Sequence, residues 1–439
     1  MFRALLVAIL ACSSLGAIAQ APPSNRPGHY LFVWTADQAK QGNDFLAVID
    51  ADPASPAYGK LVASVGTDIQ SVRIHHTEYE MPASGMLFAN DHDPNQSVIF
   101  DLRDPLTPKV AVRFQSMGGY SMPHSFLRLP NGNVLASFQF TDNGGHADHA
   151  AMMSGKTGGL VEIDDSGMVV RSVSNADPSL PDDGLLPYSL AILPEIDRVL
   201  VTNSPMQNPY LLSSNTYQVF RLSDLKLLGT HRLDPGPTGN GNVAPEEARV
   251  AADGSVYVQT LSCGIQRITA LDTPRPMAKL VHKFPGDFCG VPTIVGRYLV
   301  QSVPNFHGFA VLDIGDPANV REVSRLTVND SFSPHWTGWD KKAKRLVVTS
   351  GKKGDRLYLL KLDDKTGALS VDETFRDTDG KVGFSFASRH WPHGWSGEGA
   401  PHGAVFSRLC FRCWRRCSRY RKTAFHPILL KNSECRFLQ

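Results

Sequence analysis

The chain has 439 residues, 42% of them hydrophobic and 20% charged, a composition typical of a folded protein with a sizeable core. Its formal net charge of +2 hides a basic tail, residues 409–439, in which eight Lys and Arg stand against one acid. Without this tail and Arg3, the remaining residues carry a net charge of −6, so the charge pattern argues against nucleic acid as a partner.

The first residues have the features of an export signal. Arg3 supplies a positive charge, Ala4 to Leu15 form a short apolar stretch, and Ala17 to Ala19 supply small residues before a cleavage point. We expect residues 1–19 to be removed as a signal peptide and the mature protein to be exported, to the periplasm if the source is Gram-negative and otherwise to the medium. Lipoprotein processing at Cys12 is the alternative. The apolar stretch is too short to span a bilayer, and we expect no membrane span elsewhere.

Seven apolar runs recur along the rest of the chain, and each closes on an aspartate or a turn. They are Phe45 to Asp50, Val98 to Asp101, Leu160 to Asp164, Tyr217 to Leu222, Gly264 to Leu271, Phe309 to Asp313 and Leu357 to Asp363. Their starts lie roughly 45 to 60 residues apart, which is the period of a β-propeller blade. A second strand precedes six of them: Met86 to Asn90, Asn133 to Phe138, Arg198 to Asn203, Ser255 to Thr260, Tyr298 to Val303 and Arg345 to Ser350. We therefore expect an all-β fold, a seven-bladed β-propeller over residues 20–408, with three strands evident in each blade.

The first strand of each blade is expected a few residues before the second. Six such strands begin near His76, Pro123, Tyr188, Pro245, Val291 and Pro334. The seventh blade must be assembled from both ends of the chain, because Tyr30 to Trp34 and Phe45 to Asp50 have no first strand ahead of them, whereas Pro401 to Ser407 form a first strand with nothing after it. Pairing the C-terminal strand with the N-terminal blade would close the ring and leave no unpaired inner edge.

The seven cysteines do not form one framework. Cys12 belongs to the signal segment, and four lie in the basic tail: Cys410, Cys413, Cys417 and Cys435. Cys263 and Cys289 either pair in an oxidising compartment or remain buried free thiols, and the sequence leaves both readings open. The Cys-x-x-Cys of the tail would allow a zinc site, but the change in composition favours a disordered or out-of-frame extension.

Histidines recur at the starts of the first strands. In ring order, these starts present His402, His75 with His76, His124, Tyr188, Glu246 with Glu247, Pro292 and His335. Histidines therefore occupy four consecutive blades and should converge at one mouth of the central channel. Such a set of imidazoles on rigid strands suits copper, zinc or iron. Because adjacent residues of a regular strand point to opposite faces, either the chain bends at His75 and His76 or one of them only supports the ligands.

Other histidines are weaker candidates. They are His146 and His149 in a Gly-rich loop, His307 on the rim, and His390 and His393 in the connection 384–400. The loop histidines would form a surface metal site or remain solvated. The connection 384–400 could cover the channel mouth, with Trp391 and Trp395 lining a small apolar pocket, and ordinary loop packing is the alternative.

Several motifs add a family resemblance. They are His75-His76, Met122-Pro123-His124-Ser125 followed by Leu129-Pro130-Asn131-Gly132-Asn133, Pro245-Glu246-Glu247-Ala248-Arg249 followed by Cys263-Gly264-Ile265-Gln266-Arg267, and Pro401-His402. In their order and spacing between Tyr30 and Arg408, these motifs together resemble the selenium-binding protein and methanethiol oxidase family.

The resemblance implies a seven-bladed propeller and, for exported bacterial members, a copper-dependent oxidase. Such an enzyme converts methanethiol with O2 and water to formaldehyde, hydrogen sulfide and hydrogen peroxide. Carried over position by position, the copper ligands would be His75, His76, His124 and His402, and ring position alone adds His335. Copper is therefore the expected cofactor, with a small thiol and O2 as the reaction partners.

One departure concerns the segment after the paired histidines, where the family commonly has a Cys-rich motif linked to selenium. Here Thr77 to Pro82 contain no cysteine, so selenium binding by that route is not expected and the substrate stays open.

Glu246 and Glu247, across the ring, are candidate catalytic proton carriers or ligands of calcium as a second ion. Hydrogen bonding within the channel wall is the alternative for both. Two other functions stay open for the whole chain: a metal-dependent propeller hydrolase of the lactonase type, and a non-catalytic binding scaffold. The sequence does not determine the oligomeric state.

Overall fold

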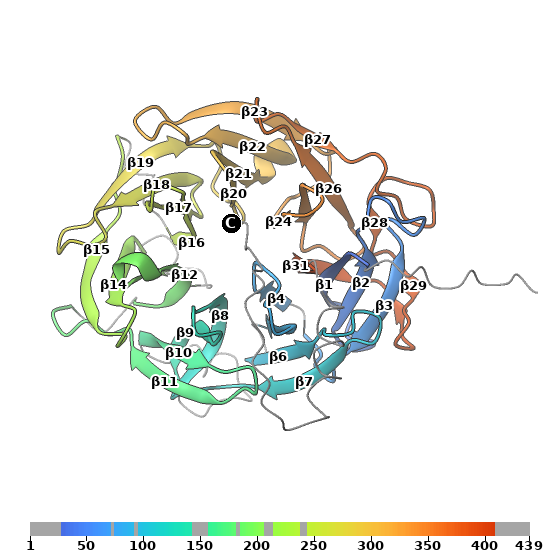
Figure 1. The fold of residues 1–439 in the computed structure, drawn as a ribbon, viewed down its shortest axis with the longest axis horizontal. Helices are drawn as coiled ribbons and strands as arrows, with labels where there is room; N and C mark the ends of the chain where they lie inside the picture. Colours follow the sequence, from blue (N-terminus) through green and yellow to red (C-terminus); the bar gives the residue numbers. More distant parts are fainter. Residues whose placement is uncertain are drawn as a thin grey trace, which may run out of the picture.

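The computed structural model describes residues 28–71, 74–91, 95–142, 157–180, 185–205, 214–237 and 244–408. These residues form seven sheets of four or five strands that are arranged radially around one axis (Figure 1). The expected all-β, seven-bladed propeller is therefore confirmed. The predicted signal segment 1–19 and the basic tail 409–439 lie outside the described residues, so their assignments remain predictions.

Each blade is an antiparallel sheet whose strands run outward from the axis in order. The innermost strands are β4 (Ile74–Thr77), β8 (Tyr120–Arg128), β12 (Pro187–Leu193), β16 (Pro245–Val250), β20 (Thr293–Val295), β24 (Trp336–Asp340) and β31 (Ala400–Phe406). The second strands are β5 (Met86–Asp91), β9 (Val134–Thr141), β13 (Arg198–Asn203), β17 (Val256–Thr260), β21 (Tyr298–Val303), β25 (Arg345–Thr349) and β1 (Tyr30–Ala36). The third strands are β6 (Gln96–Asp101), β10 (Thr157–Ile163), β14 (Thr216–Arg221), β18 (Gly264–Thr269), β22 (Gly308–Asp313), β26 (Arg356–Leu362) and β2 (Phe45–Asp50). The outermost strands are β7 (Lys109–Phe114), β11 (Val169–Ser174), β15 (Leu227–Arg232), β19 (Met277–Lys283), β23 (Arg321–Thr327), β27 (Leu369–Val371) and β3 (Leu61–Gly66).

The outermost strand of each blade is the element that the sequence analysis did not predict. The apolar runs expected to close each blade are its third strands, such as β2, which is buried along its whole length. In β7, by contrast, the exposed Lys109, Ala111 and Arg113 alternate with partly buried residues. An edge strand buries alternate side chains and exposes the others to solvent. It therefore lacks the continuous apolar run by which the third strands were recognised.

The core lies between the blades. Along each inner strand, alternate side chains face opposite neighbours, as the pleat requires. In β1, Leu31 and Val33 join a cluster with Trp336 of the preceding blade, whereas Phe32 joins a cluster with Leu87 of the following blade. Burial of each such large apolar side chain contributes roughly 1.5–3 kcal/mol. The interfaces between blades therefore carry the stability, which leaves the axis free for polar residues.

The ring closes as the sequence predicted. Strands β1 and β31 pair antiparallel, with Phe32 opposite Val405. The amide of Ser407 donates a hydrogen bond of 2.7 Å to the carbonyl of Tyr30, just beyond the paired strands. A buried contact of 2.7 Å between His29 Nε2 and Asp340 Oδ2 also ties the start of β1 to the neighbouring blade. The two ends of the described chain are thus built into one blade.

Cys263 and Cys289 form a disulfide with a Cα–Cα distance of 5.0 Å. This pairing decides between the two alternatives that the sequence left open. Cys263 lies in the turn between β17 and β18, and Cys289 lies in the segment that leads into β20, so the bond links two adjacent blades. The four tail cysteines lie outside the described residues.

Short elements complete the described part of the chain. They are the 3-10 helices η1 (Pro194–Ile196) and η4 (Pro304–Phe306), strand β28 (Phe384–Ser385) at the edge of β26, and the hairpin of β29 (Arg389–His390) and β30 (Ser396–Gly397). Among the described residues, no helix has the length and apolar character needed to cross a membrane.

Candidate metal centre

A β-bulge in β4 places His75 and His76 on the same side of the strand. Ile74 pairs with Asp91 and Thr77 pairs with Ala89, so three steps along β4 match two steps along β5. The extra residue breaks the alternation of side chains. As a result the two imidazoles stack, with their centroids 3.8 Å apart and an interplanar angle of 14°. The chain therefore bends at this pair, which was one of the two alternatives that the sequence left open.

The same bulge recurs in the innermost strands of four other blades. The bulged segments are 401–404 in β31, 123–126 in β8, 187–190 in β12 and 245–248 in β16. All four begin with proline, which lacks an N–H and is tolerated where a strand leaves its pairing. The first residue inside each bulge is His402, His75, His124, Tyr188 or Glu246, and the second is Gly403, His76, Ser125, Ser189 or Glu247. One backbone irregularity thus positions nearly all the residues that the sequence analysis selected.

Gly403 fits this arrangement because the two inner strands touch there. A Cβ atom on Gly403 would lie 2.6 Å from the backbone nitrogen of Thr77. The absence of a side chain lets β31 approach β4 closely enough to bring His402 beside His75, with ring centroids 4.8 Å apart.

His335 reaches the cluster without a bulge. It lies just before β24, where its amide donates to the carbonyl of Thr349 and its carbonyl accepts from the amide of Val291, each at 2.8 Å. A Cβ atom on Gly290 would lie 2.5 Å from the carbonyl oxygen of His335, so a glycine is needed at this contact. The ring of His335 lies 4.5 Å from that of His402. The placement that rested on ring position alone is therefore matched by the geometry.

The five histidines converge in two overlapping groups. His75, His76, His335 and His402 form one group, and His76, His124 and Glu247 form the other; within each group one donor atom per residue lies within 4.8 Å of the others. His75 Nε2 and His124 Nε2 are 2.8 Å apart. Histidines that are far apart in sequence thus share one space at the start of the inner strands, as predicted.

Several nitrogens in this space have no hydrogen-bond partner among the described residues. They are both ring nitrogens of His76 and the Nδ1 atoms of His335 and His402. His76 is fully buried. A buried polar atom without a partner costs on the order of 1–3 kcal/mol, so these atoms require an explanation. A bound cation that accepts one lone pair from each ring would supply an explanation for one nitrogen of each histidine.

The environment favours the neutral form of three of the imidazoles, those of His76, His335 and His402. Burial lowers the pKa of His76 well below its usual value, and the neighbouring histidines lower it further. The pKa of His402 is lowered in the same way. Desolvation lowers the pKa of His335 to about 4. Neutral imidazoles offer lone pairs, which is the form that binds metal ions.

His124 has a defined orientation. Its Nδ1 lies 2.9 Å from the carbonyl oxygen of Tyr188, which can only accept a hydrogen bond. When the ring is neutral, its proton therefore sits on Nδ1, and Nε2 keeps its lone pair facing His75. The Tyr188 ring packs on His124 with centroids 3.5 Å apart and fixes the plane of the imidazole.

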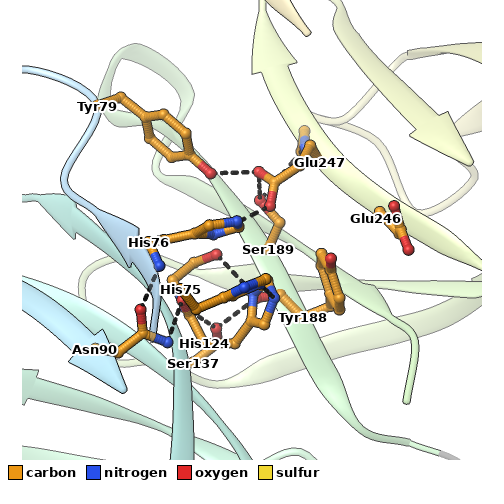
Figure 2. A network of polar contacts seen from close by, with 12 residues as sticks. His75, His76, Tyr79, Asn90, His124, Ser137, Tyr188, Ser189, Glu246 and Glu247 are labelled. Atoms are coloured by element: carbon orange, nitrogen blue, oxygen red, sulfur yellow. Dashed lines mark hydrogen bonds and ion pairs between the residues drawn. The ribbon is translucent and has the colours of Figure 1, made fainter. Parts of the chain in front are cut away.

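The two glutamates of the β16 bulge have different surroundings. Glu247 Oε1 lies 3.6 Å from His76 Nδ1, whereas Glu246 lies to the side of the histidines and accepts a 3.0 Å hydrogen bond from Gln259 (Figure 2). Burial raises the pKa of Glu246 to about 8, and the charge of Glu247 adds to this effect. The two carboxyl groups thus belong to different environments, and only Glu247 contacts the cluster among the described residues.

Sequence reasoning assigned no role at the site to two residues around Glu247, the aromatic Tyr79 and the basic Arg249. Tyr79 donates a hydrogen bond to Glu247 and stacks on Trp336, with centroids 4.9 Å apart and an interplanar angle of 4°. Arg249 lies 3.0 Å from Glu247. Arg249 could have been found, because residues two apart on a strand share a face. Tyr79 lies in the connection after β4, where no strand spacing indicates which way a side chain points.

The connection 384–400 does not form the pocket considered in the sequence analysis. Trp391 is fully buried and packs on Phe45 of β2, with ring centroids 4.4 Å apart. His393 Nδ1 contacts the hydroxyl of Ser64 in β3 at 2.7 Å. The hairpin of β29 and β30 lies at the outer side of the β1–β3 blade (Figure 1). Ordinary loop packing was therefore the correct alternative, because apolar side chains of the neighbouring blade cover the tryptophan.

The other histidines that the structure describes are not part of the cluster. His307 lies between η4 and β22, where its Nδ1 contacts the carbonyl of Phe332 at 3.2 Å. His146 and His149 lie outside the described residues, so the prediction of a surface metal site there stays a prediction.

No protein-family model matches the chain. Methanethiol oxidase from Hyphomicrobium sp is 33% identical over 117 residues, which are 26% of this chain and 26% of that protein. The match thus spans about a quarter of the relative's length.

Two solved structures are similar in fold. A hypothetical selenium-binding protein from Sulfolobus tokodaii has a TM-score of 0.68 at 15% identity, covering 87% of this chain and 94% of that one. The periplasmic gluconolactonase of Pseudomonas aeruginosa has a TM-score of 0.58 at 13% identity, covering 87% and 99%. At such low identity, these likenesses show the fold alone. The sequence match to methanethiol oxidase bears out the resemblance that the motifs indicated, and the first of these structures agrees with it in fold.

Proposed function

We propose that this distant homologue of methanethiol oxidase is itself a copper-dependent oxidase of a small thiol. The reaction consumes the thiol, O2 and water and yields an aldehyde, hydrogen sulfide and hydrogen peroxide, which balances for methanethiol with formaldehyde as the aldehyde. The proposal includes export of the protein by its predicted signal segment.

The observation that carries the proposal is the set of buried imidazole nitrogens without partners. A protein interior rarely leaves such atoms unsatisfied unless a ligand completes them. The set is rich in imidazole and poor in carboxylate, which suits copper, zinc or iron better than calcium. Histidine ligation therefore argues against a calcium-dependent hydrolase of the lactonase type, and the sequence match to methanethiol oxidase favours copper among the remaining metals.

The residues proposed to hold copper are His75, His76, His124, His335 and His402. Copper would supply the one-electron steps that couple thiol oxidation to the reduction of O2. The protein supplies neutral imidazoles on rigid inner strands, which fix the donor atoms before the metal binds. The stacked Tyr79 and Trp336 form an apolar wall beside His76 that limits water at the site.

Glu246 and Glu247 are proposed to serve the reaction in different ways. Because its pKa is raised to about 8, Glu246 holds a proton near neutral pH and is the better candidate for a proton carrier. Glu247 already accepts from Arg249, whose guanidinium supplies a positive charge beside the carboxylate. We therefore leave calcium out of the proposal.

Metal analysis combined with an oxygen-uptake assay tests the proposal. The full-length protein expressed in copper medium should contain copper and should consume O2 and release peroxide when methanethiol is added. His124→Ala removes one donor and should lose both copper and activity. Equal copper in the two proteins, or copper without thiol-dependent peroxide, would contradict the proposal.

A further inference from the structure

The two oxygens of Glu247 are unequally used. Oε2 accepts hydrogen bonds from the hydroxyls of Tyr79 and Ser189 (Figure 2). It accepts a third from Arg249, and the bonds from Ser189 and Arg249 are each 3.0 Å long. Oε1 has no hydrogen-bond partner among the described residues, although Glu247 is 1% exposed. Three donors therefore anchor one oxygen and leave the other directed elsewhere.

The free oxygen faces His76. Glu247 Oε1 and His76 Nδ1 are 3.6 Å apart, and both ring nitrogens of His76 lack partners among the described residues. A carboxylate oxygen can only accept a hydrogen bond. If the two side chains moved slightly closer, Nδ1–H would donate a hydrogen bond to Oε1. The lone pair of the neutral ring would then be on Nε2.

The anchor of Glu247 is rigid. The Tyr79 ring lies between the guanidinium of Arg249, 3.8 Å from the ring centroid, and Trp336, on which it stacks. Trp336 in turn donates a hydrogen bond of 2.9 Å from Nε1 to the carbonyl of Ala404. Glu247 is thus held from three blades, and rotation of its carboxylate would break three hydrogen bonds.

We infer that Glu247 is a positioning residue that fixes His76 in the tautomer with its proton on Nδ1, so that Nε2 is presented as a metal donor. This inference rests on the proposed copper site. It assigns Glu247 a role through His76, distinct from those of proton carrier, calcium ligand or wall residue considered from the sequence. A hydrogen bond from a carboxylate to the far nitrogen of a ligating histidine orients the ring and strengthens it as a donor.

Glu247→Gln tests the tautomer without changing volume. The single carbonyl oxygen of the amide would take the three donors, so its NH2 group would face His76 and demand an acceptor. The His76 proton would then move to Nε2 and remove that atom as a donor. We expect the affinity for Cu(II), measured by chelator competition, to fall about 10- to 100-fold, with an altered Cu(II) EPR spectrum. Unchanged affinity and spectrum would overturn the inference.

Glu246→Gln is the matched control. It makes the same change one residue away, at a side chain that accepts from Gln259 and belongs to neither donor group. Its copper affinity and EPR spectrum should match those of the wild type. Equal losses in both variants would indicate a general disturbance of the β16 bulge and would contradict a specific contact with His76.

A double-mutant cycle separates positioning from direct ligation. In a His76→Ala background, Glu247→Gln should cause no further loss of copper affinity, because its effect passes through His76. A further loss would show that Glu247 binds the metal itself and would overturn the inference. Circular dichroism and melting temperature verify that each variant is folded.

The metal-free protein provides a test that does not depend on copper. ¹⁵N chemical shifts of His76 should report a proton on Nδ1 in the wild type and on Nε2 in Glu247→Gln. If the wild type binds no copper but the His76 proton still moves from Nδ1 to Nε2 in Glu247→Gln, the proposed function is refuted and the inferred tautomer is supported. Copper binding without the switch would refute the inference and leave the proposed function standing.

Discussion

The two halves of the central ring use one backbone device for different chemistry. In β31, β4 and β8, the first residue inside the bulge is a histidine, whereas in β12 and β16 it is Tyr188 or Glu246. The histidine half contains ring nitrogens without partners in the described structure, while Glu246 is hydrogen-bonded by Gln259. The bulge therefore determines where a side chain points, and the residue type determines whether the place becomes a site or a wall.

Substitutions at equivalent bulge positions should give the largest difference between the two halves. His75→Ala removes a proposed ligand and should weaken copper binding by more than about 100-fold, because losing a ligand costs more than losing its support. Tyr188→Phe, in the other half, keeps the ring that packs on His124 and should change the affinity by less than about 3-fold. Chelator competition on both full-length variants measures the contrast. Similar losses in the two would contradict the division into halves.

Removing the disulfide tests how much it stabilises the half of the ring whose bulges carry no histidine. Cys263 and Cys289 are separated by 26 residues, and closing a loop of this length stabilises the fold by about 3.5 kcal/mol in the chain-entropy model. Replacing both cysteines by alanine should lower the free energy of unfolding of the metal-free protein by about this amount in a urea titration. A reductant should have the same effect on the wild type and none on the variant. No change would show that blade packing alone holds this side.

The titration of Glu246 should sharpen the contrast between the halves. Its pKa is raised to about 8, so the folded state binds a proton that the unfolded state releases above about 4.5. The free energy of unfolding contributed by this group is therefore highest below pH 4.5 and falls until about pH 8. Between pH 5 and pH 7, the wild type should lose about 2–3 kcal/mol relative to Glu246→Gln. Parallel curves for the two proteins in denaturant titrations would rule out this burial of a protonated carboxyl.

The smallest effect is expected at the outer edge of the blades. Val170 in β11 is 53% exposed, and Val170→Thr should change the free energy of unfolding by no more than about 0.5 kcal/mol. Val161→Thr, on the adjacent β10 where the side chain is fully buried, should cost about 1–3 kcal/mol because a hydroxyl enters the core. Thermal melts of the pair measure the difference. A large loss at Val170 would indicate that the outer strand packs more tightly than its exposure implies.

Sequence patterns predicted the parts of the molecule that depend on local periodicity. The second and third strands were found because their apolar runs are buried on both sides, and the closure was found because one blade lacked a strand at each end of the chain. The outermost strands were missed because half of their residues, such as Lys109 and Arg113, face solvent. The hydrophobic pattern therefore reports burial, and it fails where burial ends.

The sequence predicted which histidines form the candidate site better than it predicted how they are arranged. Histidines at equivalent repeat positions pointed to convergence, and five of them do converge. The bulge that turns both His75 and His76 inward could not be read from the sequence, because a regular strand would have separated them. Tyr79 and Trp336 were missed because their contact joins segments from two blades, and spacing along the chain carries no record of it.

The sequence by itself determined the sevenfold repeat, the closure and the residue types at the axis, because these follow from periodicity and from what each residue type can do chemically. Only the tertiary structure decided which nitrogens face one another, that Cys263 pairs with Cys289, and that Glu247 rather than Glu246 contacts His76. Those outcomes depend on distances between blades, which packing and the bulges set to within an ångström or so, a precision that no local pattern contains.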